Sequence, residues 1–119
     1  MSEFRTLSLQ QLTQKLMSER PDNVDPRKGY ALVNVLSPES HADEHIPQSI
    51  NIPRGEEGTF EQKFDKDKEI VLYCASPQCD ASPQAAETLA LRGFSAVADF
   101  EGGLSVWKDA GNMTVDGSS

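Results

Sequence analysis

Residues 70–87 constrain most strongly what this chain can fold into. The run Ile70–Tyr73 is apolar and ends at Cys74, a seven-residue loop (75–81) follows, and Ser82-Pro83 then opens a helical pattern. A buried strand, a cysteine-led loop and a helix N-terminus bring a sulfur, backbone N–H groups and the positive end of a helix dipole together. We therefore expect Cys74 to ionise more readily than a free thiol, and the thiolate is the reactive form.

Length and composition describe a single soluble domain. A chain of 119 residues can bury a real core without disulfides or metal, and we expect one domain over residues 1–115 with a flexible tail over 116–119. The mean hydropathy is -0.51, and neither a membrane span nor a signal peptide is visible. We expect a cytoplasmic monomer.

The charge of -8 and the scarcity of cysteine exclude several classes of function. Because Lys and Arg form no basic cluster, we expect no nucleic-acid partner and no membrane partner. The acidity also slows the approach of small anions, so any anion site must be made from backbone N–H groups. With only Cys74, Cys79 and the pair His41/His45 as candidate ligands, we expect neither a metal site nor a cofactor.

Helical and extended patterns alternate along the chain. We predict strands at 30–36, 49–52, 69–73 and 94–100. We predict helices at 9–20 (with Ser8 as N-cap), 38–45 (with Ser37 as N-cap), around 60–64, 83–92 and 104–110. Such alternation is typical of an α/β domain with a parallel sheet. Because the carboxyl ends of parallel strands meet at one edge, we expect Cys74, Asn34 and the acidic pair Asp99/Glu101 near one crevice.

Several blocks of the sequence, in order and over roughly residues 5–115, resemble the single-domain rhodanese family. They are Leu32-Val-Asn-Val, His45-Ile-Pro-Gln-Ser-Ile-Asn-Ile-Pro53, Ile70-Val-Leu-Tyr-Cys74, Ala85-Ala-Glu-Thr-Leu, Arg92-Gly-Phe94 and Glu101-Gly-Gly-Leu-Ser-Val-Trp-Lys-Asp-Ala-Gly111. The resemblance implies a doubly wound parallel sheet of about five strands flanked by helices on both sides.

The resemblance also implies a chemistry. In that family the cysteine after the central strand takes a sulfane sulfur from a donor and holds it as a persulfide among backbone N–H groups. It then passes the sulfur to a nucleophilic acceptor. Carried over, Cys74 is the nucleophile, and its partner is a small sulfur donor or a persulfide-carrying protein. The substrate-binding loop is then Ala75, Ser76, Pro77, Gln78, Asp80, Ala81 and Ser82.

The sequence departs from the family pattern at three places. Cys79 stands five positions after Cys74, where the family often has Arg; Asn34 and Leu36 replace an acid and a base; and the loop is about two residues longer. Without the loop cation, we expect only weak activity on the thiosulfate dianion. A longer loop is also similar to the Cys-x5-Arg loop of related phosphatases, but position 80 is Asp, which repels phosphate.

These observations leave three hypotheses open. The first is sulfur transfer or sulfur carriage through a persulfide on Cys74, possible sulfurtransferase activity included. The second is a non-catalytic rhodanese-like binding module. The third is a thiol-redox switch in which Cys79 acts as a resolving thiol and closes a disulfide with Cys74; alternatively, Cys79 only fills space. The residues name neither the sulfur donor nor its acceptor.

Overall fold

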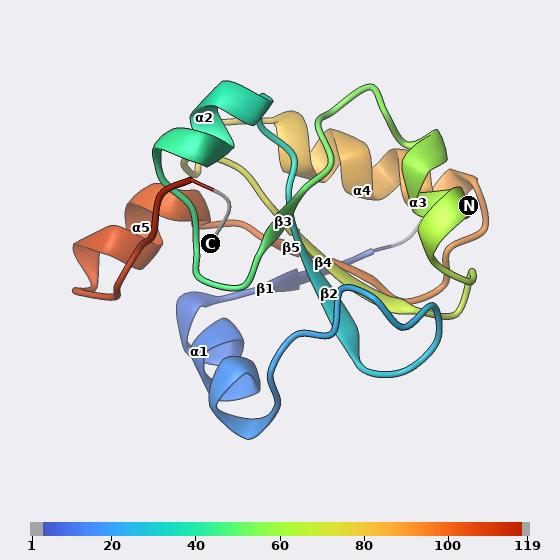
Figure 1. Ribbon diagram of the computed structural model, residues 1–119, viewed down its shortest axis with the longest axis horizontal. Coiled ribbons are helices and arrows are strands. Elements are labelled where there is room, and N and C mark those ends of the chain that lie inside the picture. The colour runs from blue at the N-terminus through green and yellow to red at the C-terminus, as the bar shows by residue number, and fades with distance from the viewer. Residues whose placement is uncertain (1–3, 118–119) are drawn as a thin grey trace.

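A computed structural model describes residues 4–117. Its centre is a five-stranded parallel sheet in the order β1-β5-β4-β2-β3, with helices on both faces (Figure 1). The strands are β1 (Arg5–Leu7), β2 (Tyr30–Asn34), β3 (Ile50–Asn51), β4 (Glu69–Tyr73) and β5 (Val97–Phe100). The helices are α1 (Leu9–Ser18), α2 (Pro38–Asp43), α3 (Gly58–Lys63), α4 (Ala81–Leu91) and α5 (Gly103–Asp109). The predicted α/β class is confirmed.

The central strand β4 and its neighbour β2 explain why the order of elements could be predicted from the sequence. All five residues of β2 are buried, and β4 pairs with β2 on one side and with β5 on the other. Strands covered on both faces give continuous apolar runs. The predicted caps Ser8 and Ser37 also hold, since each accepts a hydrogen bond from the helix that it precedes.

The prediction missed one strand, and the ends of several other elements differ by a few residues. The edge strand β1 is three residues long, too short for any periodicity, and was not predicted. Strand β5 starts at Val97 rather than at residue 94, because Phe94 is still hydrogen-bonded to the end of α4. Helix α4 starts at Ala81, two residues early, and so brings Ser82 into its first turn.

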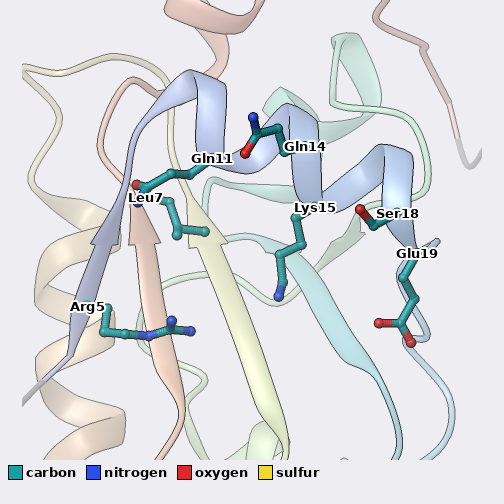
Figure 2. Close-up of a pocket in the computed structure, with 7 residues that line it drawn as sticks. All are labelled: Arg5, Leu7, Gln11, Gln14, Lys15, Ser18 and Glu19. Carbon is teal, nitrogen blue, oxygen red and sulfur yellow. The ribbon is translucent and has the colours of Figure 1, made fainter.

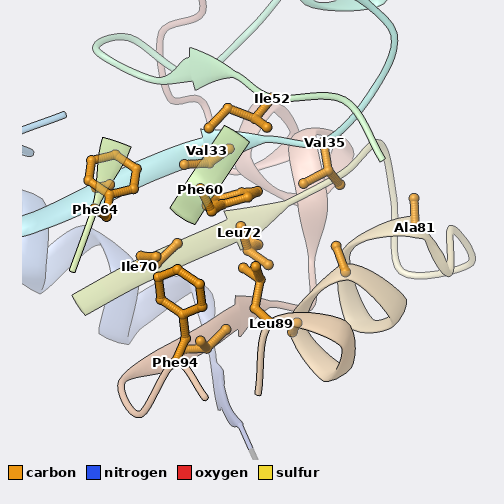
Figure 3. Close-up of a cluster of buried hydrophobic side chains, with 14 of the residues drawn as sticks. Val33, Val35, Ile52, Phe60, Phe64, Ile70, Leu72, Ala81, Leu89 and Phe94 are labelled. Carbon is orange, nitrogen blue, oxygen red and sulfur yellow. The ribbon is translucent and has the colours of Figure 1, made fainter. Parts of the chain in front are cut away.

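Two apolar cores cover the faces of the sheet. One packs α3 and α4 on the sheet and includes Cys74 and Leu72 (Figure 3). The other packs α1 and α5 on the opposite face and includes Leu12 and Trp107. Alternate residues of β4 therefore serve opposite cores, which places the Cys74 side chain on the α4 side.

The C-terminal segment is attached to the rest of the fold. The Trp107 indole donates to the Met113 carbonyl at 2.8 Å, Val115 pairs with His45 in an antiparallel bridge, and the Gly117 N–H donates to Ala42 O at 2.7 Å. The domain limit at residue 115 and the flexibility of residues 116–119 stay predictions, and the last two of these lie outside the described residues. Among residues 4–117 no helix has the length and apolar character needed to cross a membrane.

A buried lysine closes the loop before β2. Lys68 is wholly buried, and its ammonium donates to the backbone carbonyls of Asp22, Asp25 and Lys28. Three charge-assisted hydrogen bonds satisfy the ammonium and fix this loop against the start of β4.

A glycine clamps the cysteine loop to α5. Gly103 has φ +66°, and a Cβ there would lie 2.6 Å from Ser76 N and 2.7 Å from Cys74 O. The first N–H groups of α5 donate to the loop, Leu104 to Cys74 O and Ser105 to Ala75 O, both at 2.8 Å. Backbone therefore packs directly on backbone where the cysteine loop begins.

We predict that Lys68→Met lowers the free energy of unfolding by about 2–4 kcal/mol, because the three carbonyls lose their donor. Urea unfolding measures the change. Lys63→Met, at an exposed position, is the matched control and should change stability by less than about 0.5 kcal/mol. Equal effects of the two substitutions would contradict the bracing role of Lys68.

We predict that Gly103→Ala costs about 2–4 kcal/mol, through its positive φ and through overlap with the loop backbone. The control Gly111→Ala shares the positive φ (+87°) but meets nothing within 4 Å, so it should cost about 1 kcal/mol. Only Gly103→Ala should also change the rate at which iodoacetamide alkylates the two cysteines. An unchanged rate would show that Gly103 does not hold the loop.

Candidate active site: two thiols at one helix N-terminus

Cys74 follows β4 directly and carries its sulfur inward. Only 2% of the residue is exposed. The Ser82 hydroxyl donates to Cys74 Sγ at 3.3 Å, and the thiol itself donates to the Cys79 carbonyl at 3.4 Å. The sulfur therefore lies between a hydrogen-bond donor from α4 and an acceptor from the loop.

The N-terminus of α4 has no side-chain cap. Asp80 occupies the N-cap position, but its carboxylate accepts from Gln84 Nε2 at 2.9 Å and lies 3.7 Å from the Arg54 guanidinium. The first helical N–H groups are thereby left for the two sulfurs: Ala81 N–H interacts with Cys79, and Ser82 N–H with Cys74. The helix N-terminus is directed at the cysteine loop as expected, but its first N–H groups are shared between two cysteines.

The structure reverses the expected ionisation of Cys74. Burial raises the pKa of Cys74, and the hydrogen bond to Cys79 raises it further, since that contact uses the Cys74 proton. The N–H and hydroxyl of Ser82 lower the pKa but do not outweigh burial. The expectation that Cys74 ionises more readily than a free thiol was wrong, because it neglected the cost of removing a thiolate from water.

Cys79 holds the more favourable position for a negative charge. Partial burial raises its pKa, but the Cys74 thiol and the N–H groups of Ala81 and Ala75 outweigh that effect, so the pKa of Cys79 is lowered. The negative charge of Asp80 acts against this and raises the pKa of Cys79. The loop is therefore built to stabilise a thiolate on Cys79.

The other loop residues divide into donors, acceptors and exposed positions. Ala75, Ala81 and Ser82 supply N–H groups. Ser76 turns the loop by accepting from Cys79 N–H at 3.1 Å, and its carbonyl lies 4.0 Å from Cys74 Sγ. The side chains at the tip, Pro77 and Gln78, are exposed.

Asn34 does not join this group. Its backbone pairs with Tyr73, and its neighbour Leu32 packs into the core under α1 and α5. Residues Val33 and Val35 belong to the α4-side core that holds Cys74, so Asn34 faces the opposite way. Its Oδ1 accepts from Leu36 N–H at 2.8 Å, which makes it a support for the strand end.

A pocket of about 160 Å³, here called the loop pocket, opens beside Cys79. It is lined by Phe4, Thr6, Pro77, Cys79, Ser82, Pro83, Asp99 and Glu101. Cys79 and the predicted acidic pair are thus brought together, whereas Cys74 lies beneath and does not line the pocket. The part played by β1, which supplies one wall, was missed because that strand was not predicted.

Asp99 is an unusual member of the loop pocket. It is 3% exposed, and its Oδ1 has no hydrogen-bond partner among the described residues. Burial raises the pKa of Asp99; the Ser82 side chain lowers it, and the charge of Glu101 raises it again. A single polar residue inside the apolar run of β5 was the signal in the sequence.

A second hollow, about 380 Å³, lies between β1 and α1 (Figure 2). It includes Arg5 and Lys15, but both cations pair with Glu69, at 3.2 and 2.6 Å. This hollow therefore offers no reactive group. Nowhere in residues 4–117 do three or more Cys, His, Asp or Glu gather as a metal site would require.

The chain resembles known proteins over most of its length. The model of the rhodanese-like domain matches residues 8–110. The chain is 32% identical over 81 residues to thiosulfate sulfurtransferase GlpE of Pseudomonas syringae pv. syringae strain B728a, covering 68% of this chain and 74% of that protein. A GlpE protein of Pseudomonas savastanoi pv. phaseolicola matches with the same identity and the same coverage.

Solved structures share the fold. The crystal structure of the BH2092 protein from Bacillus halodurans superposes with a TM-score of 0.80 at 25% identity, covering 94% of this chain and 77% of that chain. The solution structure of the rhodanese-like domain of the Alr3790 protein from Anabaena also gives 0.80, at 22% identity, over 96% of this chain and 80% of that one. The chain belongs to the rhodanese-like domain family.

Proposed function

We propose that this protein transfers or carries sulfur through a persulfide on Cys74. Membership of the rhodanese-like family and similarity to proteins named thiosulfate sulfurtransferase support sulfur transfer in general. The observation that carries the finer proposal is the pair of donors on Ser82: its hydroxyl, 3.3 Å from Cys74 Sγ, and its N–H. The two donors stabilise an anionic sulfur at that place.

Burial suits Cys74 to holding sulfur rather than to capturing it. A persulfide enclosed at a site where the residue is 2% exposed is shielded from water and from unrelated thiols. The carbonyls that face the sulfur favour a protonated resting thiol over a permanently charged one. The sulfur would pass on to a nucleophilic acceptor once the loop opens.

Thiosulfate is a poor donor for such a site. The loop pocket presents the carboxyl groups of Asp99 and Glu101, and the nearby Arg54 is paired with Asp80. A dianion would meet like charge on its way to the thiols. We therefore propose that the donor is a small persulfide or a persulfide-carrying protein.

A thiol-redox switch is the second candidate, and one observation favours it. The Cys74 thiol donates to the backbone carbonyl of Cys79 at 3.4 Å, and each cysteine side chain shifts the pKa of the other. The two sulfurs are thus neighbours, and oxidation could close a disulfide between them.

Incubation with cysteine persulfide, followed by intact-mass and peptide analysis, tests the proposal. The native protein should gain about 32 Da, one sulfur atom, on the peptide that carries Cys74. Incubation with thiosulfate should give the same adduct at least about tenfold more slowly, because of the acidic pocket.

Two other outcomes contradict the proposal. A loss of about 2 Da with no sulfur adduct indicates a disulfide and the redox switch. No mass change with either donor indicates a non-catalytic binding module. Cys74→Ser is the control for the assignment, since it should hold no adduct at position 74.

A further inference from the structure

The two thiols differ in their access to solvent. Cys74 is 2% exposed and does not reach the loop pocket, whereas Cys79 is only partly buried and lines it. A small molecule that enters the loop pocket meets Cys79 first.

The loop pocket also contains a buried hydrogen-bond acceptor that lacks a donor among the described residues. Asp99 is 97% buried, and its Oδ1 has no partner among residues 4–117. Glu101 adds a second carboxylate to the wall, and the remaining wall is largely apolar, with Phe4 and Pro77. An ammonium or a neutral N–H group would satisfy Asp99 Oδ1, while a carboxylate or sulfonate would be repelled.

We propose that Cys79 is the outer thiol, which captures the sulfane sulfur of a small persulfide bearing an ammonium or other N–H donor in the loop pocket, and that it hands this sulfur to Cys74, the inner thiol. This proposal rests on the proposed function, since it supplies the route by which a persulfide on Cys74 would form. It assigns the loop pocket as the donor site and names the chemical class of the donor.

The two steps balance without an outside oxidant or reductant. In the first step the Cys79 thiolate attacks the terminal sulfur of the donor R–S–SH. A Cys79–S bond forms, the donor S–S bond breaks, and R–S⁻ leaves and takes a proton from water. In the second step Cys74 attacks the terminal sulfur on Cys79; a Cys74–S bond forms and the bond from Cys79 to that sulfur breaks. The proton of Cys74 passes to the departing Cys79 thiolate; before the reaction the Cys74 thiol donates to the backbone carbonyl of Cys79 at 3.4 Å.

Existing contacts assist both steps. The N–H groups of Ala75 and Ala81 stabilise the Cys79 thiolate before capture and after hand-over. The hydroxyl and N–H of Ser82 already interact with Cys74 and can stabilise the sulfur once it is transferred there. The pKa of Cys79 is lowered and the pKa of Cys74 is raised. Near neutral pH the outer thiol is therefore the stronger attacking group, which agrees with this order of steps.

Single-cysteine variants of the full chain test the order of capture. The donor is cysteamine persulfide, prepared from cystamine and sulfide, and the readout is the initial rate of the gain of about 32 Da at each cysteine. We expect Cys74→Ser still to load Cys79, which then keeps the sulfur because position 74 has no thiol to receive it, and Cys79→Ser to load Cys74 at least about tenfold more slowly than the native protein. Native-like loading of Cys74 in Cys79→Ser would overturn the outer role of Cys79.

Donor charge tests the site independently of the cysteine substitutions. The native protein should react about three- to tenfold faster with cysteamine persulfide than with the persulfide of 3-mercaptopropionate, which has a carboxylate in place of the ammonium. Glu101→Gln combined with Asp99→Asn should remove most of that preference. Glu87→Gln, an exposed position on α4 outside the loop pocket, is the matched control and should keep it.

The outcomes separate this inference from the proposed function. Equal rates for both donors, or a preference unaffected by the pocket variants, would overturn the loop pocket as donor site while a Cys74 persulfide still formed. Failure of the native protein to gain sulfur from any donor would overturn the proposed function itself. Thermal melts of each variant show that it is folded before its rates are compared.

Discussion

The site depends on how the first N–H groups of α4 are shared. A helix N-terminus leaves its first amides without intrahelical partners, and a side-chain cap usually takes one of them. Here Asp80 stands at the cap position but interacts with Gln84 and Arg54 instead. The amides of Ala81 and Ser82 are therefore available to Cys79 and Cys74. One positive helix end serves two sulfurs, and burial decides which of them carries charge.

The remainder of the fold holds these parts in register. Cys74 directly follows the carboxyl end of the central strand β4. The close contact at Gly103 allows the first N–H groups of α5 to donate to the carbonyls of Cys74 and Ala75. The short edge strand β1 pairs with β5 and completes the wall over Asp99. These backbone contacts place Cys79 in the lining of the loop pocket and leave Cys74 outside that lining.

Much of this architecture could be predicted because the buried strands β2 and β4 appear in the sequence as continuous apolar runs. The N-cap residues Ser8 and Ser37 likewise mark where their helices begin. The position of Cys74 at a strand end, with a helix directed at the loop, followed from the same pattern. Four features could not be predicted from the sequence. The strand β1 is too short to show a period, the face on which Asn34 lies depends on register, and the ionisation of Cys74 depends on burial that a linear sequence does not display. Arg54 reaches the loop from a distant turn, which no spacing rule indicates.

The most direct test of the account is an NMR titration of the native protein labelled with ¹³C at the cysteine Cβ atoms. The Cβ shift of each residue reports the ionisation of its own thiol. We predict that Cys79 titrates first, with a midpoint below that of a free thiol, and that Cys74 titrates later, with a midpoint above that of a free thiol. Earlier titration of Cys74, or indistinguishable midpoints at the free-thiol value, would contradict the unequal sharing of the α4 amides between the two sulfurs.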